Sequence, residues 1–340
     1  MRSKFAAVAI GLGVFMIVAA GLVRFYAYPT LATVPADYKG TTQLEAKGAE
    51  VLKWDSIKDP GPAVSETHDL AIESFTIADS GADAPDGVVV WVNSTTVTQD
   101  DGGIFQRTQE RAPFDGVSGA AVECDTCESW VSDTANYKGD DSRVETPVER
   151  QGQVYKFPFG TEKKTYDIWD GTLDEAVPAT FEGTEEIDGL EVYKFVQKIA
   201  PTVVSTQELP GAKFGSTEPT VEAELWYSMT RTFYVEPETG SPVNRVEERM
   251  QELRYDGVVV PVFNGTVQYT AQQVDDLVNG TDDEKGAKEN ATLLGGLRLL
   301  FPLILLVVGL ALLAGGLVMG SRARAHREDK ADEKKTLVNA

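Results

Sequence analysis

The sequence contains few of the residue types from which catalytic and metal sites are usually built. It has two histidines and two cysteines in 340 residues. A zinc site needs about four ligands, and a serine or cysteine nucleophile needs a base, for which His68 is the candidate outside the membrane. No zinc-protease, phosphate-loop or nucleophile-elbow pattern occurs. We therefore expect no catalytic residue, no metal and no cofactor, and an extracytoplasmic hydrolase ranks last among the functions considered.

Basic residues are also scarce, since 31 Lys and Arg stand against 53 Asp and Glu, for a net charge of −22. A surface of this sign repels nucleic acid and anionic lipid, so we expect neither as a partner. The acids are scattered along the chain rather than gathered in one tail. Such a surface is typical of a protein that folds in concentrated salt, where charge repulsion is screened. We interpret the source as halophilic.

Charged residues are missing altogether from two apolar runs, 5–23 and 299–320. A helix of about 20 residues is long enough to cross the hydrocarbon core of a bilayer, which is about 30 Å thick. Each run is therefore predicted to be a transmembrane helix. Small residues at 18–20 also fit a signal-peptide cleavage site, but the length of the first run favours an uncleaved signal anchor.

Basic residues precede the first run and follow the second, which predicts cytoplasmic termini and an extracellular main domain in a two-pass protein of the cell membrane. Polar and turn-rich sequence next to the runs is interpreted as stalks. The predicted parts are a cytoplasmic N-terminus (1–4), a transmembrane helix (5–23), a stalk (24–43), an extracytoplasmic β-rich domain (44–278), a second stalk (279–298), a transmembrane helix (299–320) and a cytoplasmic tail (321–340).

Particular residues in and beside the apolar runs are predicted to position the helices. Arg24 and Arg298 stand at the outer ends of the runs, where arginines reach toward lipid phosphates and anchor a helix at the interface. Gly316 and Gly320 are spaced by four, a pattern of small residues that lets helices approach closely. We expect these glycines to pack the two helices together or to form a homodimer.

The outer segment holds both cysteines and four N-glycosylation sequons. Cys124 and Cys127 are expected to form a local disulfide, because the compartment outside the cell is oxidising. A thioredoxin-like redox pair and a zinc site shared between two chains are the alternatives. The candidate glycosylation sites are Asn93, Asn264, Asn279 and Asn290.

The sequence between the stalks favours β-strands. Its segments are rich in Val, Tyr, Phe, Trp and Thr and are bounded by Gly, Pro and Asp. Residues 232–243 predict a hairpin in which Gly240 supplies a positive φ, and residues 258–268 predict a second hairpin around Asn264. Alternation in Tyr155-Lys156-Phe157 places the aromatic rings in the core and the lysine in solvent.

The predicted fold class is therefore mainly β: an antiparallel β-sandwich or open-barrel ectodomain between two transmembrane α-helices. Segments of the ectodomain also carry a resemblance. Residues 154–170 (VYKFPFGTEKKTYDIWD), 181–195 (FEGTEEIDGLEVYKF) and 234–240 (YVEPETG) are similar to the PorA-type family of actinobacterial and haloarchaeal membrane proteins. That family shares the layout of anchor, ectodomain and anchor, so the resemblance extends over nearly the whole chain.

Two function classes follow from these features. A lipid-facing β-barrel needs an apolar outward band, and the strands predicted here carry acids too densely for one. We therefore expect first a non-enzymatic, membrane-anchored surface protein whose β domain binds a ligand or an envelope lipid, glycan or protein. The alternative is a channel-forming or transport-accessory protein, since the family name implies a porin.

Overall fold

The computed structural model describes residues 2–132 and 144–338, and the chain forms two compact units. The first, the helix unit, consists of residues 1–33 and 292–340. The second, the β unit, consists of residues 34–291. The strands of the β unit form one antiparallel sheet in the order β6-β5-β4-β3-β2-β1-β12-β11-β10-β9-β8-β7. The first and last strands of the chain thus pair in the middle of the sheet.

This sheet confirms the predicted antiparallel, mainly β class. Its long strands, of 12 to 21 residues, are joined mostly by short connections. In the β unit, α3 (Asp55–Lys58) lies between β1 and β2, a 3-10 helix (Gly211–Phe214) lies between β9 and β10, and α4 (Ala271–Asn279) follows β12. The strands are β1 (Lys39–Leu52), β2 (Ser65–Ala78), β3 (Val88–Gln99), β4 (Ile104–Asp115), β5 (Trp130–Ser132), β6 (Thr146–Pro147), β7 (Tyr166–Asp170), β8 (Glu175–Ile187), β9 (Leu190–Pro210), β10 (Thr220–Val235), β11 (Pro242–Tyr255) and β12 (Val258–Tyr269).

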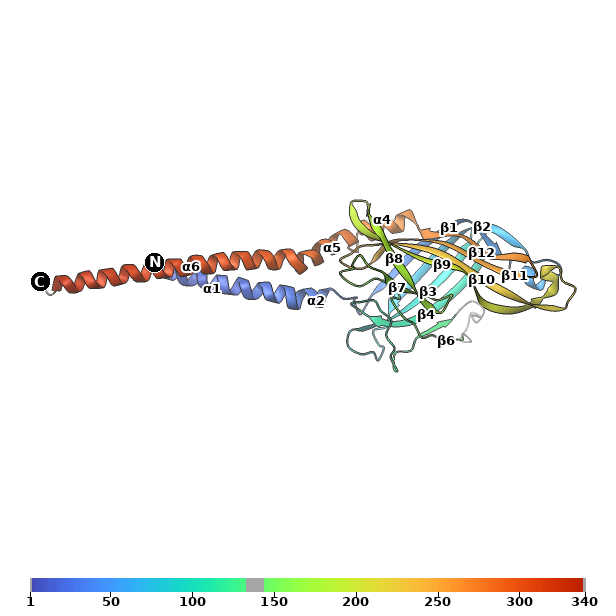
Figure 1. Ribbon diagram of the computed structural model, residues 1–340, viewed down its shortest axis with the longest axis horizontal. Helices are drawn as coiled ribbons and strands as arrows, with labels where there is room; N and C mark the ends of the chain where they lie inside the picture. The colour runs from blue at the N-terminus through green and yellow to red at the C-terminus, as the bar shows by residue number, and fades with distance from the viewer. Residues whose placement is uncertain (1, 133–143, 339–340) are drawn as a thin grey trace. The chain divides into compact units, whose positions relative to one another are not determined.

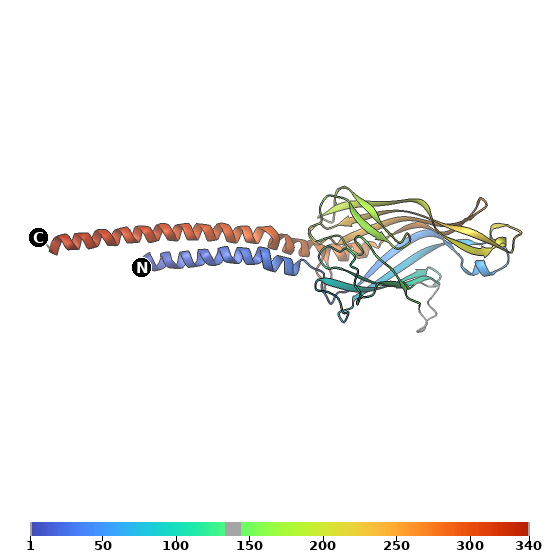
Figure 2. The same ribbon diagram turned by 60° about the horizontal axis from the view of Figure 1, so that its bottom comes forward.

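The sheet curls over, so that β1–β4 face β9–β12 across a common interior (Figure 2). Isolated bridges then connect the two sides of the open seam. Phe114 at the end of β4 pairs with Ala121, Ala120 pairs with Gln153, and Gln153 pairs with Ile168 of β7. The segment around Gln153 therefore closes the curled sheet between β4 and β7.

The interior of the curled sheet is the core of the β unit. On β10 the buried side chains alternate with exposed ones, as expected for a strand with one face in the core. Acids stand on the outward faces, among them Glu182 of β8, Glu222 of β10 and Glu248 of β11. The buried residues of β10 are Val221, Ala223, Tyr227, Met229, Phe233 and Val235.

The hairpin predicted at residues 232–243 is confirmed, because β10 ends at Val235, β11 begins at Pro242 and Gly240 has φ 69°. The second hairpin, predicted around Asn264, is wrong, because β12 continues through it in register with β11. Gly265 instead lets β1 approach, since a Cβ there would lie 3.0 Å from the Ala49 Cβ. The actual turn is Asp256-Gly257, and both residues have a positive φ.

Two further expectations differ from the structure. β1 begins at Lys39, so residues 39–43 belong to the sheet rather than to a stalk. Lys156, predicted to be exposed, is only 7% exposed, whereas its neighbour Phe157 lies in the core as predicted. Residues of a distant turn cover the outer side of this segment, and the Lys156 Nζ lies 3.7 Å from the centroid of the Phe159 ring. Burial lowers the pKa of Lys156 to about 7.

The helix unit pairs two long apolar helices. Residues 4–31 and 287–322 are long and apolar enough to cross a membrane, which confirms the two predicted apolar helices. The helices run antiparallel, and the two chain ends lie at the same end of the pair (Figure 1). The first comprises α1 (Arg2–Leu22), a π-helical turn (Val23–Ala27) and α2 (Tyr28–Leu31); the second comprises α5 (Ala287–Gly295), a π-helical turn (Gly296–Leu300) and α6 (Phe301–Val338).

Small residues spaced by seven line the contact between α1 and α6. Ala6, Gly13 and Ala20 are buried on α1, and Gly309 and Gly316 are buried on α6. A Cβ added to Gly13 would lie 2.7 Å from the Gly309 carbonyl oxygen, and one added to Gly316 would lie 2.7 Å from the Ile10 Cγ1. A repeat of seven is the spacing at which two helices keep the same faces in contact.

Candidate functional site

A polar cavity of about 280 Å³ lies inside the curled sheet and is the candidate functional site. One wall comes from β2, β3 and β4, and the facing wall comes from β10, β11 and β12. The segment around Gln153 and part of β7 complete the lining. The first wall carries Ser74, Asn93, Thr95 and Glu110, and the facing wall carries Arg231, Phe233, Arg245 and Tyr269.

Arg231 is the centre of a buried ion network on the second wall. Its Nε donates to Glu247 of β11 at 2.7 Å, and its Nη1 donates to the Gln197 Oε1 of β9 at 2.9 Å. Its Nη2 lies 3.5 Å from the Asp170 carboxylate of β7. The Nε of Arg245 lies 3.1 Å from the same Glu247 oxygen that receives Arg231. Ion pairs thus join β7, β10 and β11 inside the sheet, and a hydrogen bond to Gln197 adds β9.

Glu247 is a buried carboxylate surrounded by positive charge. Burial would raise the pKa of its carboxyl, but the positive charges of Arg231, Arg245 and Arg249 lower the pKa to about 2. The ionised carboxylate is therefore the form that the folded protein holds at neutral pH. It is only 8% exposed, so its interactions with the guanidinium groups are poorly screened by solvent.

We expect the β unit to lose stability as the pH falls from about 4.5 toward 2. A carboxyl whose folded pKa is depressed stabilises the fold above its unfolded pKa, near 4.5, and that contribution disappears as the pH falls through the folded value, about 2. Chemical unfolding of the wild type and of Glu247→Gln over this pH range tests the effect. The variant should lose less stability on acidification, and equal losses in the two proteins would assign the acid sensitivity to other groups.

The first wall of the cavity consists mostly of uncharged side chains that hydrogen-bond to one another. Asn93 Nδ2 donates to the Ser74 hydroxyl at 2.8 Å and to the Thr76 hydroxyl at 2.7 Å. Thr95 donates to the Asn93 Oδ1 at 3.1 Å. Glu110 is the charged residue of this wall, and its carboxylate accepts a hydrogen bond from Arg150 at 2.9 Å. Its negative charge is therefore compensated.

The candidate glycosylation sites lie in different environments. The Asn93 side-chain nitrogen, to which a glycan would be attached, points into the sheet interior and makes the two bonds described above. Asn264 is exposed on the outward face of β12, and Asn279 is exposed at the end of α4. Asn290 is half-buried in α5. Asn264 and Asn279 are thus the two most accessible of the four sequons.

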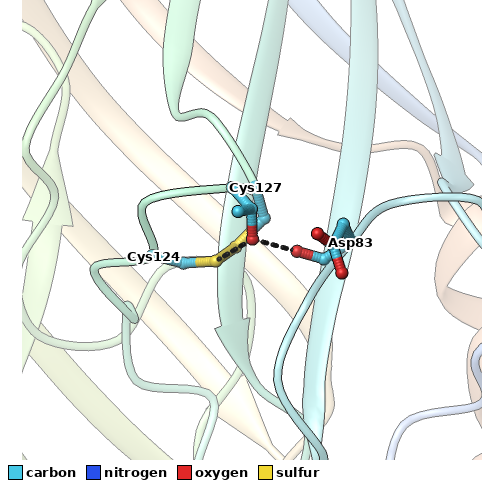
Figure 3. The surroundings of a disulfide bond; sticks show 4 residues. Asp83, Cys124 and Cys127 are labelled. Atoms are coloured by element: carbon cyan, nitrogen blue, oxygen red, sulfur yellow. Dashed lines mark hydrogen bonds between the residues drawn. A yellow bond between two sulfur atoms is a disulfide. The ribbon is translucent and has the colours of Figure 1, made fainter.

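The two cysteines lie away from the cavity lining. Cys124 and Cys127 are joined by a disulfide with their Cα atoms 5.4 Å apart (Figure 3). The hydroxyl of Thr126, between them, donates to the carbonyl oxygen of Asp83, in the connection before β3. The bond thus stiffens a short loop that rests on a neighbouring connection. No group of three or more His, Cys, Asp or Glu side chains that could hold a metal occurs in the described parts of the chain.

The structure also shows where the other residues singled out in the sequence lie. His68 lies on β2 and contacts Asp100 at 2.7 Å and Glu66 at 3.6 Å, so its ring lies between two carboxylates. Arg24 and Arg298, predicted as interface anchors, each lie in a π-helical turn of the helix unit. The Arg24 guanidinium lies 5.4 Å from the centroid of the Tyr28 ring. The ion network around Arg231 was not predicted from the sequence.

Comparisons with known proteins agree on one family. The model of the family described as Porin PorA matches residues 5–318, which include the β unit and most of the two apolar spans. Porin PorA of Corynebacterium resistens is 27% identical over 246 residues, which cover 54% of this chain and 60% of that protein. Porin PorA of Corynebacterium amycolatum is 24% identical over 290 residues, which cover 70% of this chain and 74% of that protein.

Proposed function

Because the chain belongs to the Porin PorA family, we propose that it is a membrane protein that forms a channel with further copies of itself or assists transport. The family match over the β unit and most of the two apolar spans is the observation that carries this proposal. It favours the second of the two function classes that the sequence indicated. It also favours a non-enzymatic role, since the relatives are named as porins.

The helices, rather than the strands, are proposed to cross the bilayer. A transmembrane barrel presents an apolar band about 25 Å tall to lipid, whereas Glu182, Glu222 and Glu248 stand on the outward face of this sheet. One chain contributes two apolar helices, and Gly13 and Gly316 bring these so close that no path for ions remains between them. A conduit would therefore lie between helix pairs from several copies.

The conductance of the purified full chain in planar lipid bilayers tests the proposal. We expect discrete current steps, because an assembled pore opens and closes as a unit. A variant truncated after residue 298 lacks the second helix and should give none. Detergent alone and the truncated protein are the controls, and a full chain without current steps at any voltage would contradict a channel-forming role.

We also propose that both termini are cytoplasmic and that the β unit is extracellular. Basic residues flank the apolar helices at the chain ends, and the antiparallel pairing of α1 and α6 brings those ends to the same side. Protease added to intact cells should digest residues 34–291 and leave a tag on the C-terminal tail protected. Removal of the tag together with the β unit would contradict this topology.

A further inference from the structure

We propose that the cavity inside the β unit binds a small oxyanion, a carboxylate or a phosphate group, through the guanidinium group of Arg245. Binding of this kind is an additional function of the β unit and does not rest on channel formation. Three features of the cavity support such binding: the free edge of the Arg245 guanidinium group, the charge of the lining and the size of the cavity.

Arg245 presents unused hydrogen-bond donors to the cavity. Its Nε faces Glu247 at 3.1 Å, and its guanidinium carbon lies 5.5 Å from the centroid of the Tyr269 ring. None of its side-chain nitrogens donates a hydrogen bond within residues 2–132 and 144–338, and this includes the buried Nε, which approaches Glu247 without forming one. By contrast, all three nitrogens of Arg231 contact Glu247, Gln197 or Asp170. A planar guanidinium edge with two free N–H groups matches a carboxylate or phosphate in bidentate geometry.

The charge of the interior favours an anion although the chain as a whole is acidic. Arg231 and Arg245 line the cavity from β10 and β11, and Lys156 lines it from the segment around Gln153. The carboxylates that pair with the two arginines are not lining residues, so the lining presents three basic side chains against the one acidic side chain of Glu110. On the opposite wall Glu110 is already paired with Arg150. An incoming anion therefore meets no unpaired carboxylate and gains from a cationic wall.

The size and lining of the cavity define the class of ligand. A volume of about 280 Å³ lies at the lower end of the range of about 300–1,000 Å³ that is common for ligand pockets. It is too small and too polar for the acyl chain of an envelope lipid. Ser74 and Thr95 place hydroxyl groups on the wall opposite Arg245, and Phe233 supplies an apolar surface. We infer a small organic oxyanion, with inorganic phosphate as the simplest member of the class.

Titration of the detergent-solubilised full chain with inorganic phosphate and with acetate, at constant ionic strength, tests the inference. Binding is measured by calorimetry and by the melting temperature, with glycerol as the uncharged probe. We expect saturable binding of at least one anion and none of glycerol. Arg245→Gln should weaken it by about tenfold or more, since it removes hydrogen bonds between charged groups. Arg254→Gln is the matched control, because Arg254 lies on the same strand and pairs with Glu252 at 2.7 Å.

A second variant keeps the test decisive if Arg245→Gln fails to fold. Arg245→Lys preserves a positive charge beside Glu247 but loses the planar edge, so it should fold and bind the anion more weakly than the wild type. Response to acetate alone would identify a carboxylate ligand, and response to phosphate alone would identify a phosphate ligand. No saturable binding of either anion, or equal affinity in the wild type and the Arg245 variants, would overturn the inference. The current steps in lipid bilayers should be the same whether or not an anion binds. Failure of anion binding can therefore be distinguished from failure of channel formation.

Discussion

Replacement of Arg231 by methionine is expected to lower the free energy of unfolding of the β unit by about 3–5 kcal/mol. Arg231 neutralises Glu247, which is 8% exposed, and Asp170, which is 2% exposed. Without the guanidinium group, both carboxylates stay buried with weaker compensation, because they cannot be solvated inside the sheet. Chemical unfolding of the wild type and Arg231→Met, followed by tryptophan fluorescence, measures the difference.

Two further variants distinguish the buried charge from a general effect of substitution. Lys198 on β9 pairs with Glu182 at 3.6 Å, but both side chains are exposed, so Lys198→Met should cost at most about 1 kcal/mol. Adding Glu247→Gln to Arg231→Met removes one of the two buried carboxylates that lose the compensating charge of Arg231 and should recover part of the lost stability. If Arg231→Met were no more destabilising than Lys198→Met, the network would contribute little to the fold.

The architecture could be predicted because its causes are local in the sequence. The two apolar runs have no charged residue over the length of a bilayer span, and the alternation along the strands sets one face against the core. The hairpin at Gly240 was also predictable, since a turn residue with a positive φ separates two β-rich segments. Each of these features depends on neighbours within about 20 residues of sequence.

The errors arose where distant segments override local preference. Asn264 and Gly265 form a common turn pair, yet pairing with β11 on one side and β1 on the other keeps them in a continuous strand. Lys156 alternates correctly with Tyr155 and Phe157, but a turn from elsewhere in the chain covers its outer face. Alternation alone distinguishes two faces of a strand and does not reveal that both are covered.

The cavity could not be assembled from the sequence, because its residues come from strands throughout the β unit. A signal was nevertheless present. Arg231 stands between Met229 and Phe233 in the inward phase of β10, where apolar residues are expected. Arg245 and Glu247 occupy the corresponding phase of β11, after the buried Val243. Charged residues at core positions of adjacent strands indicate a buried ion network or a ligand site.

Replacement of Gly13 by leucine is expected to separate the two membrane helices and to abolish the proposed current steps. A Cβ at this position would lie 2.7 Å from both the Gly309 carbonyl oxygen and the Leu313 amide nitrogen. These are backbone atoms, so no side chain can rotate away, and the helices must move apart. Overpacking of this kind costs about 1–3 kcal/mol, which lowers the ratio of paired to unpaired helices by about 5-fold to about 140-fold.

An engineered disulfide reports the pairing directly. A Cβ on Gly320 would lie 3.9 Å from that of Ala6, within the separation of about 3.5–4.5 Å that a disulfide requires. Ala6→Cys combined with Gly320→Cys should therefore crosslink within one chain on oxidation, and Gly13→Leu should prevent the crosslink. Gly11→Leu is the matched control on the same helix, since a Cβ at Gly11 meets nothing within 4 Å. Loss of the crosslink with intact current steps would show that conduction does not require the helix pair. If the Gly13→Leu protein crosslinked as fully as the Gly11→Leu protein, the pairing of the helices would not depend on glycine at position 13.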